Sequence, residues 1–243
     1  MQNQLSNIQV VLCNTSHPGN IGSAARAMKT MGITTLTLVA PLVQPDDHSL
    51  ALSCNAKDVI NNCRIVATLE QAIADSHLVI AMTGRKREFN ERIATPKEIT
   101  PEILTTIANQ EKVSLVFGNE QNGLTIEQLE KCNRLVTIPG NPEYFSLNLA
   151  QAVQIVCYEI YSNYNPNLEH LKTELRRATA QDIEHLLKRL DSLLSGSGFY
   201  TARNQTWVLR RLQNILHKAQ LNCEEADLLH GIFNNLSEKI QGQ

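Results

Sequence analysis

Residues 138–150 carry the sequence Ile-Pro-Gly-Asn-Pro-Glu-Tyr-Phe-Ser-Leu-Asn-Leu-Ala, between an apolar run and a helical pattern. Pro139, Gly140 and Pro142 predict a tight loop after a strand, because proline has no backbone donor and favours turns. Ser146 is predicted to cap the helix that follows. One buried stripe of that helix is formed by Leu149, Val153, Val156 and Ile160. The loop therefore offers backbone amides and carbonyls to a ligand, or it is an ordinary strand-to-helix connection.

The chain before this loop alternates strands with helices. Apolar runs predict strands at residues 8–12, 35–39, 64–66, 78–82, 113–117 and 134–138. Helical patterns cover residues 21–31, 69–74, 100–108 and 125–131. This alternation is typical of an α/β fold with a parallel sheet and helices on both faces, in which ligands bind beyond the carboxyl ends of the strands. Polar loops at residues 14–23, 83–87, 118–123 and 139–148 can meet on that edge.

A polar break at residues 161–167 predicts a boundary between a domain of residues 1–164 and a helical extension of residues 165–243. Three helices are expected near residues 181–194, 203–218 and 224–237. On the second of these, one stripe holds Arg203, Trp207, Arg211, Asn214 and Lys218, and the predicted core face holds Val208, Leu212, Ile215 and Leu216. Basic side chains around an indole suit phosphates and an unstacked base, although a solvated helix face with a half-buried indole fits equally well.

Composition limits the classes of function. The 243 residues carry a net charge of −2, which argues against a surface coated in positive potential but leaves room for a local basic patch. No apolar run approaches the roughly 18 residues of a membrane span, and the first residues do not resemble a signal peptide. Six cysteines are scattered without metal-ligand spacing, so we expect reduced, mostly buried thiols, no metal and a cytosolic protein.

Three common ligand motifs are absent or incomplete. Gly19-Asn-Ile-Gly22 follows the first strand, but it is not the G-x-G-x-x-G of dinucleotide enzymes, and the second strand ends without an acidic residue. The chain has no P-loop, since no Gly-Lys is followed by Ser or Thr. Neither His17 nor His48 lies near a nucleophile elbow, which disfavours a hydrolase.

Three other motifs occur in order along the chain. They are Asn20-Ile-Gly-Ser-Ala-Ala-Arg26, Phe117-Gly-Asn-Glu-Gln-Asn-Gly-Leu124 and the loop-to-helix sequence of residues 138–150. Together they resemble the motifs of the SPOUT RNA 2′-O-ribose methyltransferases, over residues 8–164. Residues 14–32 and 198–204 resemble, more narrowly, the bacterial TrmJ-type tRNA (cytidine/uridine-2′-O)-methyltransferases. The second motif departs from the acidic–arginine pair expected of the family, because Glu120 is followed by Gln121.

The resemblance implies an enzyme that moves a methyl group from S-adenosylmethionine to a ribose 2′-oxygen of tRNA, leaving S-adenosylhomocysteine. The implied target is the cytidine or uridine at position thirty-two of the anticodon loop. A trefoil knot in the C-terminal part of the sheet and a homodimer, with each site completed near the partner subunit, are implied as well. The implied cofactor contacts are Met82, Thr83, Gly84, Gly118, Ile138, Phe145, Ser146 and Leu147. Backbone groups at strand ends can bind an adenine and a ribose without a charged side chain.

The residue that matches the family's catalytic arginine is Arg26, which lies roughly opposite the apolar face of its helix. A guanidinium has a pKa above roughly 12, so its basic form is scarce. Two alternatives stay open: the site lowers this pKa and Arg26 acts as a base, or Arg26 holds a phosphate and orients the hydroxyl. The implied supporting residues are Asn20, Glu120, Ser146 and Asn148. For Glu120 a structural role in its loop is nearly as plausible.

The RNA contacts expected of this chain come from two places. Arg85, Lys86 and Arg87 follow a strand at the rim of the predicted site, and the helical extension adds Arg203, Trp207 and Arg211. A solvated run of charge is the alternative for the first group. Two further functions compete with a tRNA methyltransferase: a ribosomal RNA 2′-O-ribose methyltransferase, and a non-catalytic RNA-binding dimer of the same fold. Arg26 and the complete third motif argue against the non-catalytic protein.

Overall fold

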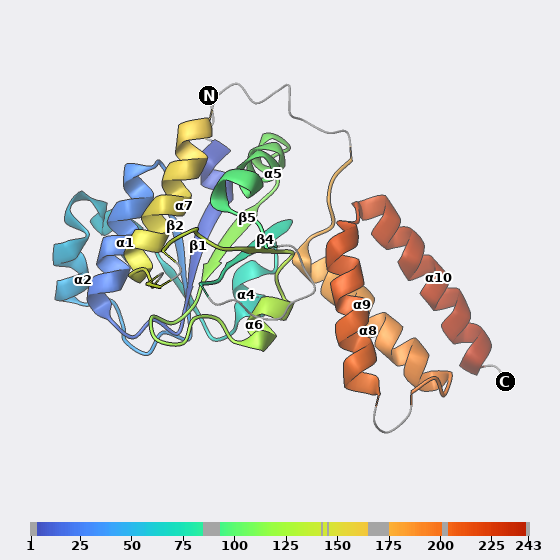
Figure 1. The fold of residues 1–243 in the computed structure, drawn as a ribbon. Coiled ribbons are helices and arrows are strands. Elements are labelled where there is room, and N and C mark those ends of the chain that lie inside the picture. The colour runs from blue at the N-terminus through green and yellow to red at the C-terminus, as the bar shows by residue number, and fades with distance from the viewer. Residues whose placement is uncertain are drawn as a thin grey trace. The chain divides into compact units, whose positions relative to one another are not determined.

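The computed structural model describes residues 4–84, 93–141, 143–144, 146–164, 175–200 and 204–241. The chain divides into two compact units, Met1–Thr173 and Glu174–Gln243. The first unit is an α/β unit and the second is made of helices, as the sequence predicts. Figure 1 shows both units as ribbons.

The first unit is built on a sheet of six strands. They are β1 (Ile8–Cys13), β2 (Thr35–Val39), β3 (Arg64–Val66), β4 (Leu78–Met82), β5 (Val113–Phe117) and β6 (Arg134–Val136). Their order is β3-β2-β1-β5-β4-β6, and every neighbouring pair is parallel. The prediction of a parallel sheet is confirmed. The last strand was expected to reach Ile138, but it ends at Val136, just before the loop that contains Pro139 and Gly140.

Seven α-helices cover this sheet within the described residues. They are α1 (Pro18–Thr30), α2 (Asp47–Leu52), α3 (Lys57–Asn61), α4 (Leu69–Ile73), α5 (Pro96–Ala108), α6 (Ile126–Glu130) and α7 (Leu149–Asn163), with short 3-10 helices at Gln4–Asn7 and Cys54–Ala56. Figure 1 shows α1 and α7 side by side over the sheet. Ile8, Val10 and Leu12 of β1 join the core that includes residues of α1, α5 and α7. Helices therefore pack on a nearly continuous apolar surface.

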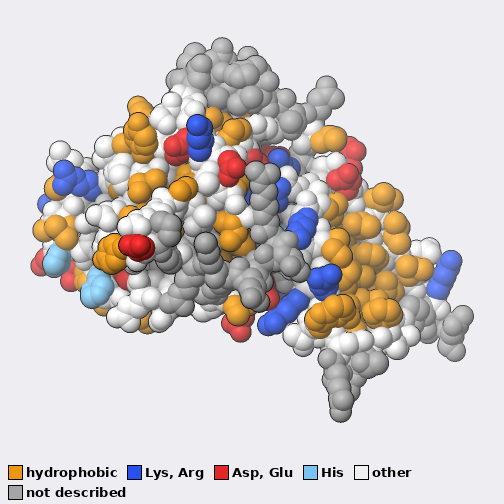
Figure 2. Space-filling model, viewed as in Figure 1, with side chains coloured by type: hydrophobic (Ala, Val, Ile, Leu, Met, Phe, Trp, Pro, Cys, Tyr) orange, Lys and Arg blue, Asp and Glu red, His pale blue; other side chains and the backbone are white. Residues whose placement is uncertain are grey.

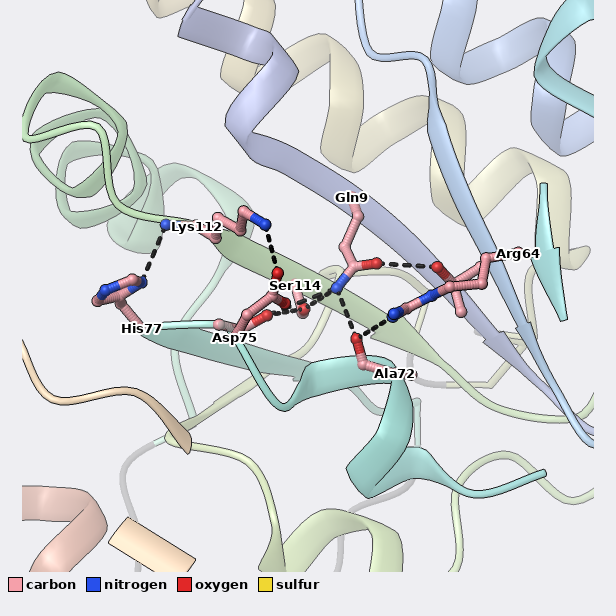
Figure 3. Close-up of polar contacts among 9 residues, drawn as sticks. Gln9, Arg64, Ala72, Asp75, His77, Lys112 and Ser114 are labelled. Atoms are coloured by element: carbon pink, nitrogen blue, oxygen red, sulfur yellow. Dashed lines mark hydrogen bonds and ion pairs between the residues drawn. The ribbon is translucent and has the colours of Figure 1, made fainter. Parts of the chain in front are cut away.

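The other face of the sheet holds a buried polar cluster, shown in Figure 3. Gln9 is only 9% exposed, and its Nε2 donates to the Ala72 carbonyl of α4 at 2.9 Å and to Ser114 Oγ at 2.7 Å. Its Oε1 accepts from Thr37 Oγ1 at 2.9 Å. Arg64 Nη2 donates to the same Ala72 carbonyl at 2.7 Å. Because buried polar groups need partners, this cluster holds α4 in one position on the sheet, away from the carboxyl ends of the strands.

Several helix starts differ from the sequence prediction. The first helix begins at Pro18 rather than Ile21, because proline is well suited to the first helical position. The helix expected from Thr100 begins at Pro96, after a capping box between Thr95 and Glu98. Ser146 is not a helix cap. The N-cap of α7 is Asn148, whose Oδ1 accepts from the Ala150 amide at 2.9 Å.

The second unit contains α8 (Ala180–Gly196), α9 (Gln205–Ala219) and α10 (Cys223–Gln241). Its small core is formed by Ala178, Ile183, Leu186, Leu216 and Ala226, with Leu187, Leu221, Leu229 and Phe233 packed against it. Leu216 confirms one predicted core residue of α9, and Val208 and Leu212 are partly buried. Ile215 is 59% exposed, so its assignment to the core is wrong. Among the described residues, no helix has the length and apolarity to span a bilayer.

Candidate active site

A cavity of about 340 Å³ opens at the carboxyl ends of the central strands. Seven of the residues predicted to contact a cofactor line it: Met82, Thr83, Gly84, Gly118, Ile138, Ser146 and Leu147. Phe145, the eighth, lies outside the described residues. The chain returns from β6 to α7 past this cavity, and α7 contributes Leu149 and Ala152 to its wall. The sequence analysis predicted their helix but did not identify these two residues as part of the cavity wall. Hydrophobic periodicity shows which face of a helix is buried, but it does not show whether a ligand site lies beside that face.

The wall at the end of β5 depends on a close backbone approach. A Cβ at Gly118 would lie 2.1 Å from the carbonyl carbon of Gly123 and 2.2 Å from the amide nitrogen of Leu124. Gly123 has a φ of +67°, a conformation in which glycine is favoured. Its amide donates to the Asn119 carbonyl at 2.8 Å, which closes the turn. The second motif therefore folds back tightly and presents backbone atoms to the cavity.

One carboxylate connects the three sequence motifs. Glu120, which lines the cavity, accepts through Oε2 from the amide and hydroxyl of Ser16, at 3.0 and 2.9 Å. Its Oε1 accepts from Asn20 Nδ2 at 2.9 Å. Asn20 Oδ1 in turn accepts from Asn148 Nδ2 at 2.9 Å. Three of the predicted supporting residues, Asn20, Glu120 and Asn148, thus join one hydrogen-bonded row although the first and last are 128 positions apart in the chain. This row is here called the Glu120 row (Ser16, Glu120, Asn20 and Asn148).

The Glu120 row fixes the charge state of its carboxylate. Partial burial by itself would raise the pKa of Glu120, but the hydrogen bonds from Asn20 and Ser16 outweigh it and hold this pKa below its ordinary value of 4.5. Hydrogen bonds to the charged form favour ionisation. At neutral pH Glu120 is therefore an anion with both oxygens engaged, which suits orientation of Asn20 better than acceptance of a proton.

The departures in the second motif also have a structural account. Asn119 Nδ2 donates to the Asn14 carbonyl at 2.7 Å, and its Oδ1 accepts from the Gln121 amide at 2.9 Å. Asn14 lies in the left-handed region with a φ of 54°. Asn119 therefore ties the end of β5 to the loop after β1, and neither Asn119 nor Gln121 brings a positive charge to the cavity that both line.

Arg26 lies apart from the cavity of its own chain. Its side chain is exposed on α1, and its Nη1 donates a hydrogen bond to Cys54 Sγ at 3.5 Å. Asn20 lies six positions earlier on the same helix, which is about 240° around the axis. The described lining of the cavity includes Glu120 but not Arg26. One copy of the chain thus assembles the predicted supporting residues without the predicted catalytic arginine.

The structure describes only some of the residues predicted to contact RNA. Arg85, Lys86, Arg87 and Arg203 lie outside the described residues. Trp207 is 64% exposed, more than the half-buried indole of the alternative, while a solvated helix face stays an alternative to an RNA contact. Arg211 Cζ lies 5.7 Å from the centre of the Trp207 ring, within range of a cation–π contact. An exposed indole held beside a guanidinium offers a stacking surface next to a positive charge.

The described residues contain no group of three or more His, Cys, Asp or Glu side chains placed to hold a metal ion. All six cysteines are free thiols. Cys13, Cys132 and Cys157 are buried, while Cys54 is exposed. Burial raises the pKa of Cys13 and of Cys157 to about 12, so these thiols stay protonated at neutral pH.

Known proteins resemble this chain over nearly its full length. Residues 7–158 match the model of the SpoU rRNA methylase family, and residues 181–243 match that of the C-terminal domain of the tRNA methyltransferase TrmJ. The tRNA (cytidine/uridine-2′-O-)-methyltransferase TrmJ of Photorhabdus laumondii is 41% identical over 237 residues, covering 96% of this chain and 98% of the relative. The TrmJ of Escherichia coli K12 is 39% identical over 244 residues, covering 98% of both chains.

Two solved structures give the same picture. TrmJ from Z. mobilis ZM4 superposes with a TM-score of 0.81 at 30% identity, covering 94% of this chain and 98% of that structure. A protein solved for insight into the 2-OH methylation of C/U34 on tRNA superposes with a TM-score of 0.51 at 25% identity, covering 63% of this chain and 93% of the other. The similarity to TrmJ from Z. mobilis extends over both units.

Proposed function

This chain belongs to the SpoU rRNA methylase family, and we propose that it is an S-adenosylmethionine-dependent tRNA 2′-O-ribose methyltransferase acting on cytidine or uridine in the anticodon loop. The observation that carries the proposal is the Glu120 row, which joins the three motifs beside one cavity at the strand ends. Similarity to TrmJ proteins over the whole chain supports tRNA as the substrate, and a tRNA substrate favours a cytoplasmic location.

The cavity fits the cofactor in size and chemistry. Its volume of about 340 Å³ lies in the usual range of roughly 300–1,000 Å³ for small-molecule sites. Met82 and Leu149 supply apolar surface for an adenine, while Thr83, Gly84 and Gly118 supply backbone groups at the strand ends. Ile138, Ser146, Leu147 and the predicted Phe145 complete the proposed binding residues. When bound, S-adenosylmethionine supplies an electrophilic methyl group.

The reaction joins the ribose 2′-oxygen to the methyl carbon as the carbon–sulfur bond breaks, and the hydroxyl proton must leave. Glu120 is a poor acceptor for that proton, since its pKa is lowered and both of its oxygens accept other hydrogen bonds. We assign it the orientation of Asn20. We assign Asn148, whose Nδ2 donates to Asn20 at the far end of the row, to orientation of the hydroxyl. Ser146 lines the cavity and we assign it to the same region.

The position of Arg26 supports a homodimer in which each site receives this residue from the partner. Arg26 is exposed and apart from the described cavity lining of its own chain. The exposed side of α7, which packs beside α1, carries apolar groups suited to a subunit contact: Ile155, Tyr158 and Tyr161 are 38%, 57% and 49% exposed. In this arrangement Arg26 binds a substrate phosphate and orients the hydroxyl, a role that a guanidinium performs without losing its proton.

We assign residues 1–164 to cofactor binding and methyl transfer, and residues 165–243 to tRNA binding and support of the dimer. Trp207 and Arg211 offer a stacking surface and a charge on α9. Arg203 and the basic run Arg85–Arg87 are assigned to phosphates from their sequence alone. The knot implied by the family resemblance remains part of this proposal.

Mass mapping of ribose methylation in total RNA, with and without this protein, tests the function. We expect one 2′-O-methyl pyrimidine in tRNA anticodon loops to disappear, at position thirty-two rather than at position thirty-four. Loss of a ribosomal RNA mark instead would favour the ribosomal alternative. Unchanged tRNA and ribosomal RNA would contradict the enzyme assignment and favour a non-catalytic RNA-binding protein.

Purified protein tests the roles of the residues. Arg26→Ala is expected to abolish turnover and to leave S-adenosylhomocysteine affinity within a few-fold of wild type, because Arg26 lies apart from the cavity of its own chain. Lys97→Ala, which removes an exposed cation from α5, is the matched control and should keep full turnover. Equal loss of affinity and turnover in Arg26→Ala would contradict this division of roles.

A further inference from the structure

Among its described residues, the C-terminal unit exposes more large apolar side chains than it buries. The large buried ones are Ile183, Leu186, Leu193 and Leu216. Exposed large apolar side chains of the unit are Leu175, Phe199, Trp207, Ile215, Leu228, Ile232 and Leu236. Figure 2 shows hydrophobic side chains gathered over α8–α10. Exposed apolar patches of this kind mark interaction surfaces.

One part of this surface is a regular stripe on α10. Leu228, Ile232 and Leu236 are 64%, 44% and 43% exposed and recur every four residues. Glu225 and Lys239 are exposed and continue the same stripe at its two ends. At 100° per residue the five positions span about 80° of the helix surface, so they form one face. On α9, by contrast, Trp207 and Ile215 are separated by the charged Arg211 and make no continuous apolar stripe.

The spacing within this stripe is symmetric. From Glu225 to Lys239 the steps are three, four, four and three residues, centred on Ile232. A second α10 laid antiparallel on the first therefore brings Leu228 against Leu236 and Glu225 against Lys239, twice each. The two ends carry opposite charges, so both end contacts are attractive, whereas a parallel pairing would face each charge with its like.

We propose that the stripe Glu225–Leu228–Ile232–Leu236–Lys239 of α10 pairs antiparallel with the same stripe of a second copy of this chain. The occupant is another α10, because the stripe complements itself in both shape and charge. The apolar part spans nine residues and is small beside the roughly 1,200–2,000 Å² that a stable interface buries. We therefore expect this contact to form only within the dimer of the proposed enzyme, so the inference rests on the proposed function. In that dimer the two α10 helices are tethered, and the resulting high effective concentration favours their pairing.

This contact gives the tRNA-binding unit a fixed partner. Pairing through α10 joins the C-terminal units of two chains directly, while the surface formed by Trp207 and Arg211 lies on α9 and outside the paired stripe. Two such surfaces in one assembly would bind the phosphates of one tRNA as a single charged platform.

Disulfide mapping in the full-length double variant Leu228→Cys/Leu236→Cys tests the pairing. Under mild oxidation we expect a covalent dimer whose bond joins position 228 of one chain to position 236 of the other. The two positions within one helix are about 12 Å apart, too far for an internal disulfide. Mass spectrometry identifies the bonded positions whatever the native thiols do.

The control is Asp227→Cys/Asn234→Cys, which places two thiols on another exposed side of α10. We expect its covalent dimer to form at least tenfold more slowly. Bonds between like positions, equal rates in the two variants, or no bond between copies would overturn the proposal. The last result is expected if the catalytic unit of the same chain or RNA covers the stripe. The assay needs neither cofactor nor tRNA, so its failure is distinct from a failure of methylation.

Reversal of the end charges tests the register. In an Ile232→Cys background, where the thiols meet at the centre, Lys239→Glu should slow dimer formation several-fold. Adding Glu225→Lys should restore the rate, because opposite charges face each other again. Glu225 also accepts from the Asn222 amide at 2.9 Å, so far-ultraviolet circular dichroism must show unchanged helicity. If the double reversal stays as slow as the single one, the antiparallel register is wrong.

Discussion

Replacement of Gly118 by alanine tests how the backbone of the second motif forms the cavity wall. The added Cβ would lie 2.1 Å from the carbonyl carbon of Gly123, 2.2 Å from the amide nitrogen of Leu124 and 2.5 Å from the Gly123 oxygen. Non-bonded carbon atoms are at their optimal separation at about 3.5–4.0 Å, so the turn must move by on the order of 1 Å. The hydrogen bond from Gly123 to Asn119 opposes that movement.

The size of the effect follows from what must move. Overpacking typically costs about 1–3 kcal/mol, and we expect the upper end because backbone rather than a flexible side chain meets the new atom. For a unit of this size, 1 kcal/mol shifts Tm by roughly 2–4 °C, so the expected decrease is about 6–12 °C. Displacement of the wall should also weaken S-adenosylhomocysteine binding by at least about tenfold. Differential scanning calorimetry and isothermal titration measure the two effects.

Gly84→Ala is the matched control. Gly84 lines the same cavity, but a Cβ there would meet no atom within 4 Å. Its stability should therefore stay within about 0.5 kcal/mol of wild type, as for an ordinary surface substitution. The reasoning is refuted if Gly118→Ala melts within 2 °C of wild type, or if Gly84→Ala loses as much stability as Gly118→Ala.

Other parts of the molecule give predictions of the same kind. Glu120→Gln should reduce turnover with cofactor affinity nearly unchanged. The Tm of this variant should lie below that of wild type, and the difference should shrink as pH falls below 4.5, because a carboxylate with a lowered pKa stabilises the fold only while it is ionised. A Tm difference that is independent of pH would contradict this. Gln9→Leu should cost about 1–3 kcal/mol by leaving Thr37 and Ser114 short of partners, with unchanged cofactor affinity. Arg211→Ala should lower the salt slope of tRNA binding by about 1, whereas Trp207→Ala should weaken binding at an unchanged slope; equal slopes in both variants would remove the phosphate role of Arg211.

The strands were the most predictable part of the fold. The bounds of β2, β3, β4 and β5 match the strands expected from the sequence. β4 and β5 are buried at every residue, and a parallel strand covered on both faces is largely apolar, whereas β3 is a short edge strand that stays mostly exposed. Helix ends were less predictable. Pro18 and Pro96 begin their helices before the apolar periodicity does, and α2 and α3 are too short to show any periodicity.

The candidate site was predictable as a set of residues but not as an arrangement. The three motifs predict that Asn20, Glu120 and Asn148 belong to one site, but only the structure shows that Asn20 is hydrogen-bonded to both of the others. Ser146 looked like a cap because it is a good capping residue, but Asn148 occupies the position with the required geometry. The separation of Arg26 from the cavity is invisible in the sequence, because it depends on the direction in which α1 faces.

Charge places a constraint on how this protein meets its substrate. Residues 1–164 contain 12 Lys and Arg against 15 Asp and Glu. Asn119 and Gln121, at the rim of the cavity, are neutral, and the side chain of Asn119 is engaged by Asn14 and the turn. Glu120 adds a negative charge at the cavity that is partly screened by its hydrogen bonds.

Because the catalytic unit carries a net negative charge, it attracts a polyanion only where positively charged side chains are clustered. The exposed Arg26 and the run Arg85–Arg87 supply such cations in the catalytic unit, and Arg211 beside Trp207 supplies one on α9 of the C-terminal unit. A single chain has few such cations, and each phosphate contact adds only about one to the slope of log affinity against log salt concentration. A dimer doubles all three, and pairing through α10 would hold the two α9 surfaces together. We therefore expect tRNA affinity to depend on dimer formation more steeply than cofactor affinity does, because a single chain supplies few of these cations.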